Sequence, residues 1–174
     1  IPVLGGTEID IKKRYPQIQP DQTVFVKSLV TAVRKSEALL NLMGNHEKVY
    51  VNGQEISPVI RDEKGDCYRI IVSQKPMELV IECRADSDGC RLRMTISTLY
   101  YRGSNAKDYL NHIELHSPYF TEEEGLCVSK LYSSEVKPEK AEYELPHGSA
   151  TNQVDFREWY EEEKGQIAYA VTRC

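Results

Sequence analysis

The spacing of hydrophobic residues near the start of the chain is that of a helix. Between residues 21 and 45 the apolar positions fall mostly three or four residues apart; they are Phe25, Val26, Leu29, Val30, Val33, Leu40 and Met43. Asp21, which follows Pro20, is a suitable helix N-cap, and Gly44 is a suitable C-terminal stop. The pattern therefore predicts a long amphipathic helix over residues 21–45, preceded by an extended segment over residues 1–20.

In the middle of the chain the hydrophobic pattern changes from helical spacing to alternation. Asn52-Gly53 is a strong hairpin signal, and it separates two short strand-like runs. Further β-rich runs follow at residues 67–72, 77–83, 91–97 and 109–116. Short strands joined by tight turns predict a twisted antiparallel sheet of about seven strands over residues 48–116.

Two C-terminal helices are predicted after this sheet. Thr121 and Glu124 have the spacing of a capping box, and a helix that begins there should end near Val136, before Pro138. A last helix follows, with an aromatic residue and a tryptophan on its apolar side, Phe156 and Trp159. The order of helix, antiparallel sheet and two helices predicts an α+β fold. We expect residues 1–174 to form a single domain, with a helical part at 121–174.

Charge is distributed unevenly along the chain. Between residues 120 and 164 twelve acidic residues face five basic ones, a net charge of −7, whereas the whole chain carries −5. A negative surface repels nucleic-acid phosphate and attracts basic protein segments. The sequence therefore favours protein binding over catalysis, and the acids expected to face a partner are Glu122, Glu123, Glu124, Glu161, Glu162 and Glu163.

Membrane and targeting signals are weak in this sequence. No apolar run approaches the roughly 18 residues that a membrane span needs. The first residues do not resemble a signal or transit peptide, and the chain does not begin with Met. We therefore expect no membrane span, and either a removed targeting segment or a trimmed N-terminus.

The five cysteines cannot all pair within one chain, because their number is odd. Cys83 and Cys90 flank a turn rich in aspartate and could face each other across a hairpin. A disulfide between them and reduced thiols in a reducing compartment are both compatible with the sequence, and the reduced state is favoured.

Catalytic and metal-binding patterns were sought among the histidines and cysteines. His112 and His116 lie four residues apart and could be joined by Glu114 or Cys127, but neither a CxxC pair nor an HExxH motif accompanies them. Cys127 and His147 could form a nucleophile pair only if the fold brings them together. We therefore predict no catalytic residue, no metal and no cofactor.

A short basic cluster near the N-terminus is the best candidate for nucleic-acid binding. It consists of Lys12-Lys13-Arg14-Tyr15, and it has no aromatic stacking platform beside it. A solvated segment explains it more simply, so direct nucleic-acid binding is not expected.

Three local matches suggest a known family. The strand run over residues 78–85 ends in an acid and a cysteine, residues 117–123 (SPYFTEE) precede a predicted helix, and residues 153–160 (QVDFREWY) place an aromatic and a tryptophan three apart. In this order they resemble the mitochondrial acidic matrix proteins, also known as the mitochondrial glycoprotein family or the receptor for the globular heads of complement. That family has a long N-terminal helix, a seven-stranded antiparallel sheet and two C-terminal helices.

The resemblance implies a non-enzymatic homotrimer in the mitochondrial matrix. Such a protein would act as an adaptor or chaperone-like factor that binds basic RNA-binding or ribosomal proteins and supports RNA processing, RNA editing or translation. On this reading Phe25, Leu29, Phe156 and Trp159 cover the sheet and form subunit contacts.

Two other function classes remain open. Residues 49–56 and 125–127 also resemble fragments of a von Willebrand type D domain, which would make the chain a secreted protein-interaction module; that family is rich in paired cysteines. The other alternative is an enzyme whose catalytic residues carry no recognisable motif.

Overall fold

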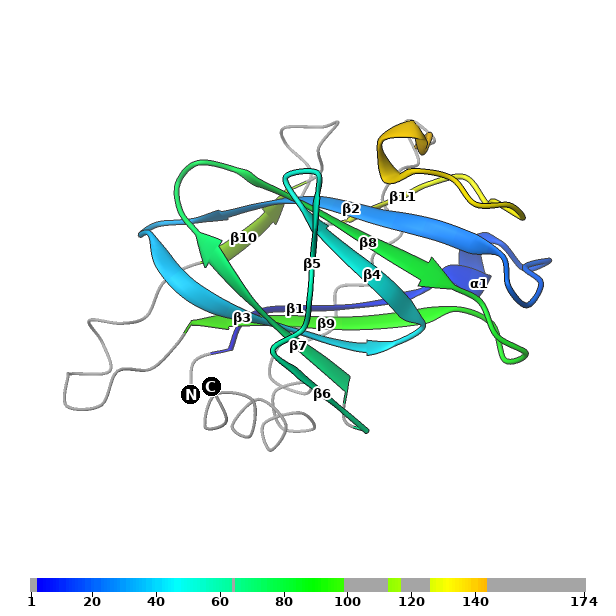
Figure 1. Ribbon diagram of the computed structural model, residues 1–174, viewed down its shortest axis with the longest axis horizontal. Coiled ribbons are helices and arrows are strands. Elements are labelled where there is room, and N and C mark those ends of the chain that lie inside the picture. The colour runs from blue at the N-terminus through cyan, green and yellow to red at the C-terminus, as the bar shows by residue number, and fades with distance from the viewer. Residues whose placement is uncertain (1–2, 64, 99–112, 117–125, 144–174) are drawn as a thin grey trace.

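The computed structural model describes residues 3–63, 65–98, 113–116 and 126–143, and in this part the chain is built mainly from antiparallel strands (Figure 1). The strands form two sheets that lie one over the other. Sheet A contains, in spatial order, β1 (Val3–Asp10), β9 (Arg91–Thr98), β3 (Ser36–Gly44), β7 (Gly65–Val72) and β6 (Ile60–Asp62). Sheet B contains β10 (Ile113–His116), β2 (Thr23–Ala32), β8 (Met77–Arg84), β4 (His46–Val51) and β5 (Gln54–Ile56).

Three short elements complete the described part of the chain. Strand β11 (Cys127–Val128) pairs with β2, so it belongs to sheet B. The helix α1 (Ile11–Arg14) and the 3₁₀-helix η1 (Pro138–Lys140) are each a single turn. Neither helical segment, in the part of the chain that the structure describes, has the length and hydropathy that a membrane crossing requires.

The strand order is that of a double-sheet jelly roll. Setting aside β6 in sheet A and β10 and β11 in sheet B, sheet A runs β1-β9-β3-β7 and sheet B runs β2-β8-β4-β5, and the chain crosses between the sheets at most of its connections. All pairs are antiparallel. A jelly roll of this kind buries one face of each sheet against the other and leaves the two outer faces for other contacts.

The core lies between the sheets and follows from the period-two alternation of the strands. In sheet B, Val26 lies opposite Ile81, and in sheet A, Leu40 lies opposite Tyr68. All four side chains are at most 1% exposed. Each buried aliphatic side chain of this kind stabilises the fold by roughly 1.5–3 kcal/mol relative to its exposed state.

The prediction of an α+β fold with a long N-terminal helix is wrong. Residues 21–45 form the strands β2 and β3, joined by a turn at residues 33–35. In β2 the side chains at alternate positions are buried, namely Val24, Val26, Ser28, Val30 and Ala32. The helical spacing was a coincidence of two strands that are hydrophobic on both faces, and the many β-branched residues favour the extended state.

The predicted helix from Thr121 to Val136 is also wrong where the structure describes it. Residues 126–136 contain no helix; Cys127 and Val128 pair with Lys27 and Val26 at the edge of sheet B, and the rest of the range is bridges, bends and irregular backbone. The last predicted helix, including Phe156 and Trp159, lies outside the described residues.

The prediction of antiparallel strands in the middle of the chain is confirmed. The hairpin at Asn52-Gly53 joins β4 and β5, and the runs at 67–72, 77–83 and 91–97 are β7, β8 and β9. These strands do not form one sheet, however, but are divided between the two layers. Sequence alternation shows which residues share a face, but it does not show which sheet a strand joins.

Candidate functional site

A cleft opens on the outer face of sheet B, and we call it the strand-face cleft. One wall is the outward side of β4 and β8, and the other is the segment 133–138, which lies across the sheet after β11. The cleft has a volume of about 450 Å³. Its lining residues are Asp21, Thr23, Glu47, Lys48, Tyr50, Glu82, Arg84, Ser133, Ser134, Glu135, Val136, Lys137 and Pro138.

The strand wall of the cleft is set by the register of β4 and β8. Val49 and Ile81 face each other and point into the core, where both are 0% exposed. Their neighbours along the strands therefore point outward, with Lys48 opposite Glu82. Alternation in these two strands thus places an ammonium and a carboxylate side by side on the cleft wall.

The second wall is anchored to β2 by several contacts. The fully buried ring of Phe25 packs edge-to-face against Tyr132, with ring centroids 6.3 Å apart. The Phe25 backbone N–H donates to Ser129 Oγ at 2.8 Å, and the Lys27 ammonium lies 4.9 Å from the centre of the Tyr143 ring. Figure 1 shows β11 beside β2, with the chain that follows β11 on the outer side of sheet B. These contacts hold the segment in place, so the cleft is preformed.

Two titratable groups inside the cleft have shifted pKa values. Burial and the nearby carboxylates of Glu82 and Glu55 raise the pKa of Tyr50 to about 12. Burial also raises the pKa of the Glu82 carboxyl, together with the charge of Glu47, and the cations Lys48 and Arg84 oppose this shift. The Tyr50 hydroxyl donates to Glu82 Oε2 over a long distance of 3.5 Å. The phenol is therefore a stable donor at neutral pH, and the Glu82 carboxyl is less acidic than an ordinary glutamate.

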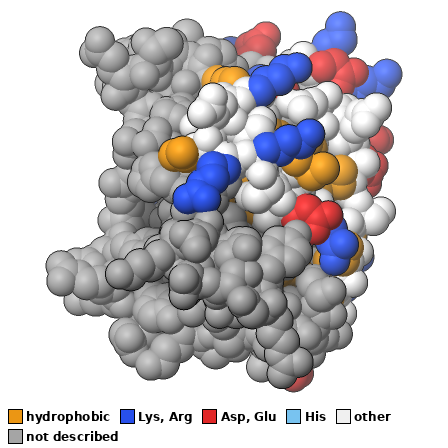
Figure 2. Space-filling model, turned by 90° about the vertical axis from the view of Figure 1, so that its left-hand side faces the viewer, with side chains coloured by type: hydrophobic (Ala, Val, Ile, Leu, Met, Phe, Trp, Pro, Cys, Tyr) orange, Lys and Arg blue, Asp and Glu red, His pale blue; other side chains and the backbone are white. Residues whose placement is uncertain are grey.

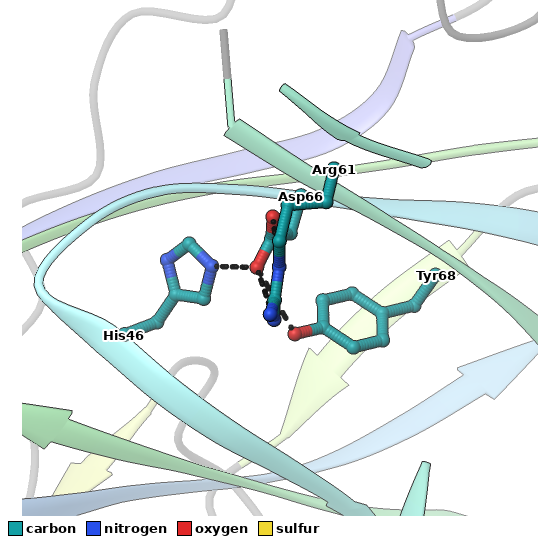
Figure 3. Close-up of polar contacts among 4 residues, drawn as sticks. All are labelled: His46, Arg61, Asp66 and Tyr68. Carbon is teal, nitrogen blue, oxygen red and sulfur yellow. Dashed lines mark hydrogen bonds and ion pairs between the residues drawn. The ribbon is translucent and has the colours of Figure 1, made fainter. Parts of the chain in front are cut away.

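A second polar group lies next to this cleft, and we call it the Asp66 cluster (Figure 3). Arg61 binds Asp66 through two parallel hydrogen bonds of 3.1 Å each, from Nε and Nη2. His46 Nε2 lies 2.8 Å from Asp66 Oδ2, and the Tyr68 hydroxyl donates to the same oxygen at 3.5 Å. The carboxylate thus joins the start of β4 to the β6–β7 hairpin.

Electrostatics keep Asp66 ionised. Burial alone would raise its pKa, but the hydrogen bonds from Arg61 and His46 outweigh burial, and the net pKa of Asp66 lies below its usual value. An ionised Asp66 can only accept, so His46 Nε2 carries the proton of their hydrogen bond. Among the described residues, His46 Nδ1 is buried and has no hydrogen-bond partner.

The Asp66 cluster lines a shallow hollow of about 440 Å³, which shares Glu47 with the strand-face cleft. Within the described residues no group of three or more His, Cys, Asp or Glu side chains is arranged to hold a metal ion. Asp66 is already bound by Arg61, His46 and Tyr68, so its free accepting capacity is small. The cluster is therefore a structural clamp between strands, and the cleft is the better ligand site.

The residues predicted from sequence to face a partner are not at either location. Glu122, Glu123, Glu124, Glu161, Glu162 and Glu163 all lie outside the described residues, as do Phe156 and Trp159. Phe25 lies beneath the segment that follows β11, and Leu29 is half-buried in β2 opposite Glu78 of β8. Phe25 thus covers the outer face of a sheet, but from a strand and not from a helix.

The weaker candidates from sequence are also dispersed. His112 and His147 lie outside the described residues, and His116 ends β10. The basic cluster at residues 12–15 forms α1 and its C-cap, where the Tyr15 hydroxyl donates to the Ser129 carbonyl at 2.8 Å. Cys127 is buried in β11.

The described cysteines are reduced. Cys67, Cys83, Cys90 and Cys127 are all buried, and none of these four takes part in a disulfide. A hydrogen bond with Cys90, together with burial, raises the pKa of the Cys83 thiol well above its usual value. The two thiols on either side of the β8–β9 turn therefore do approach each other, as the hairpin reading predicted, but they are not bridged.

Sequence reasoning missed the cleft residues Tyr50 and Glu82 and the Asp66 cluster. Alternation in β4 and β8 was visible and could have placed Lys48, Tyr50 and Glu82 on one face. Nothing in the sequence could have joined His46 to Asp66, since twenty residues separate them and the pairing depends on how two sheets meet. No family model, curated protein or solved structure matches this chain.

Proposed function

We propose that this chain is a non-enzymatic binding domain that holds a carbohydrate in the strand-face cleft. The observation that carries the proposal is the composition of the cleft wall. Four carboxylates (Asp21, Glu47, Glu82 and Glu135) and three cations (Lys48, Arg84 and Lys137) line it, so the charges nearly cancel. A cleft of this kind offers dense hydrogen bonding without a strong field, and it suits a neutral ligand better than a polyanion.

Sugar hydroxyls fit this wall because each can donate and accept at the same time. Carboxylates accept hydrogen bonds, ammonium and guanidinium groups donate them, and charge-assisted bonds are the stronger kind. The hydroxyls of Thr23, Ser133 and Ser134 add groups that can do either. The Tyr50 ring supplies an apolar surface of the kind that the C–H groups of a sugar ring can cover.

The jelly-roll architecture supports this proposal only by analogy. Lectin domains are among the proteins that use the fold, but so are viral capsid proteins and cupin enzymes, and a fold does not determine a function. The mitochondrial adaptor reading implied a long N-terminal helix, and those residues are two strands. We therefore base the proposal on the cleft and not on the family resemblance.

Glycan-array screening of the whole chain tests the proposal, followed by titration of the best ligand into two variants. Glu82→Gln removes a charged acceptor from the cleft and should weaken binding about tenfold or more, since a hydrogen bond to a charged group contributes about 1.5–3 kcal/mol. Glu37→Gln, on β3 of the other sheet, is the matched control and should bind like the wild type. The proposal fails if no glycan binds, or if both variants weaken binding equally.

A glycoside hydrolase is the second candidate, and Glu82 is the reason. A carboxyl with a raised pKa in the same cleft as other carboxyl groups is an arrangement found in glycosidases, where it separates a general acid from its partner. Glu47 and Asp21 line the same cleft and would be the candidate partners. Release of nitrophenol from aryl glycosides, abolished in Glu82→Gln and retained in Glu37→Gln, would identify the chain as an enzyme and replace the binding proposal.

A further inference from the structure

The end of the sandwich at the left of Figure 1 carries an exposed group of basic and aliphatic side chains, which we call the basic end. It consists of the β2–β3 turn at residues 33–35, the β7–β8 turn at residues 73–76, and the outward-facing Arg69 and Ile71 of β7. Figure 2 faces this end and shows Lys and Arg side chains beside hydrophobic ones on its described surface. None of these residues lines either the strand-face cleft or the hollow of the Asp66 cluster.

Two aliphatic side chains at the basic end are more than half exposed to solvent. Val33 is 55% exposed and Ile71 is 58% exposed. Val59 is the one other large hydrophobic side chain of the described residues with comparable exposure. Single exposed aliphatics are ordinary on protein surfaces, but two within one basic group indicate a contact surface.

Among the described residues of the basic end and the strand positions next to it, cations outnumber acids. Arg34, Lys35, Arg69 and Lys75 are all exposed, whereas Glu37, opposite Ile71 in the β3–β7 register, is the single acid within residues 33–37 and 69–76. The whole chain is negative, with a net charge of −5. The basic end is therefore positively charged although the chain as a whole is negative. Electrostatic attraction would orient this end toward an anionic surface.

Hydrogen bonds hold the two turns together. The Gln74 side-chain amide donates to the Val33 carbonyl at 3.1 Å, and the Ala32 backbone N–H donates to the Ser73 carbonyl at 2.8 Å. Ser73 Oγ also accepts from the Lys75 backbone N–H at 3.2 Å. The two turns thus present their side chains from one connected platform, which lowers the entropic cost of binding.

We propose that the basic end binds the surface of an anionic phospholipid bilayer. Val33 and Ile71 enter the interface between headgroups and acyl chains, and Arg34, Lys35, Arg69 and Lys75 contact lipid phosphates and carboxylates. Peripheral binding of this kind combines buried apolar area with electrostatic attraction. A nucleic acid would leave the aliphatic side chains without a partner, and the residues of the basic end include no aromatic ring on which a base could stack.

Vesicle flotation with the whole chain tests this proposal. Vesicles of phosphatidylcholine containing phosphatidylserine should carry the protein upward at low salt, and vesicles of phosphatidylcholine alone should not. Lys35→Gln/Lys75→Gln should weaken binding about 10- to 30-fold, since each basic residue near an anionic surface contributes about 1 kcal/mol. Val33→Ser/Ile71→Ser should weaken it severalfold without changing charge.

The matched control is Lys12→Gln/Lys13→Gln, which removes two exposed charges from α1 at the other end of the sandwich. This control should float like the wild type. The proposal is overturned if the wild type binds neither kind of vesicle, if it binds both equally, or if the control loses as much binding as the Lys35/Lys75 variant. Capture by RNA or by an acidic peptide without vesicle binding would likewise overturn it.

Discussion

At the scale of single residues, Tyr50 and Glu82 determine the electrostatics of the strand-face cleft. Both point outward from a sheet whose inner face is apolar, and the segment after β11 partly removes them from water. Their pKa values rise for the same main reason, burial that disfavours the charged form. The cleft therefore contains a phenol and a carboxyl whose protonation depends on the fold. The shifted pKa values of Tyr50 and of Asp66 each predict how the stability of the fold changes with pH.

Tyr50 should make the folded state sensitive to alkali. Its pKa is about 12 in the folded chain and about 10 in an unfolded one. A raised folded-state pKa contributes stability that is present below about pH 10 and is lost as pH rises toward about 12. Urea unfolding at increasing pH should therefore show a shallower alkaline decline for Tyr50→Phe than for the wild type. If the free energy of unfolding declined equally with pH in both proteins, the raised pKa of Tyr50 would be contradicted.

Asp66 should act at the opposite end of the pH scale. Its pKa lies below the usual value, so its contribution is present at neutral pH and is lost as pH falls through the folded-state pKa. Asp66→Asn should lower the free energy of unfolding at neutral pH by about 2 kcal/mol, because Arg61 and His46 lose a charged acceptor. The variant should also lose part of the acid dependence of the wild type. Asp88→Asn, in the exposed β8–β9 turn, is the control and should change neither quantity.

At the scale of elements, the turns have tighter requirements than the strands. Gly44 follows the last core residues of β3 with a φ of +99°, and an added Cβ would lie 2.1 Å from the Arg91 carbonyl oxygen. Gly53, in the β4–β5 hairpin, also has a positive φ, of +83°, but an added Cβ would meet nothing within 4 Å. A side chain at Gly53 would therefore cause backbone strain alone, whereas one at Gly44 would cause both backbone strain and a steric clash.

Alanine at these two positions should have unequal effects. Gly53→Ala should cost about 1 kcal/mol of unfolding free energy, the strain of a left-handed conformation alone. Gly44→Ala should cost at least about 2 kcal/mol, because the backbone of β9 must also move. Urea unfolding of both variants measures the difference. Equal costs would mean that the β3–β9 pairing next to Gly44 is looser than described.

Strand positions could be predicted from the sequence where polar and apolar residues alternate cleanly. Residues 91–97 are such a run. Asn52-Gly53 predicts a tight hairpin turn, because both central residues of that turn need a positive φ. The helix prediction for residues 21–45 failed because both faces of β2 are covered near its start. Val24 and Val26 are buried in the core, and Phe25 is buried on the other face by the segment around Tyr132. A strand covered on both faces loses its alternation, and its spacing can then imitate a helix.

At the scale of the whole molecule, the described part presents surfaces of different character. The strand-face cleft has nearly balanced charge, and the basic end is positive. The strongest negative charge of the sequence, at residues 120–164, lies largely outside the described residues. Protein binding through those acids stays a prediction, and so do trimer assembly and a matrix location.

Neutralising the acidic residues tests that prediction. A variant with glutamine at Glu122, Glu123, Glu124, Glu161, Glu162 and Glu163 should lose capture of basic proteins at low salt, because six negative charges are removed. Its sugar binding should not change, since none of the six lines the cleft as described. Sedimentation of the wild type at low and high salt measures the oligomeric state in the same buffers. Unchanged capture by the variant would end the acidic-face hypothesis.

The central claim is that ligand binds between β4, β8 and the segment after β11. Amide chemical-shift mapping by NMR, with the best sugar from the array, tests this claim most directly. The account predicts that shifts concentrate at Lys48 and Tyr50 in β4, at Glu82 and Arg84 in β8, and at residues 133–137. Shifts concentrated at the turns of residues 33–35 and 73–76 instead, or spread evenly over both sheets, would contradict it.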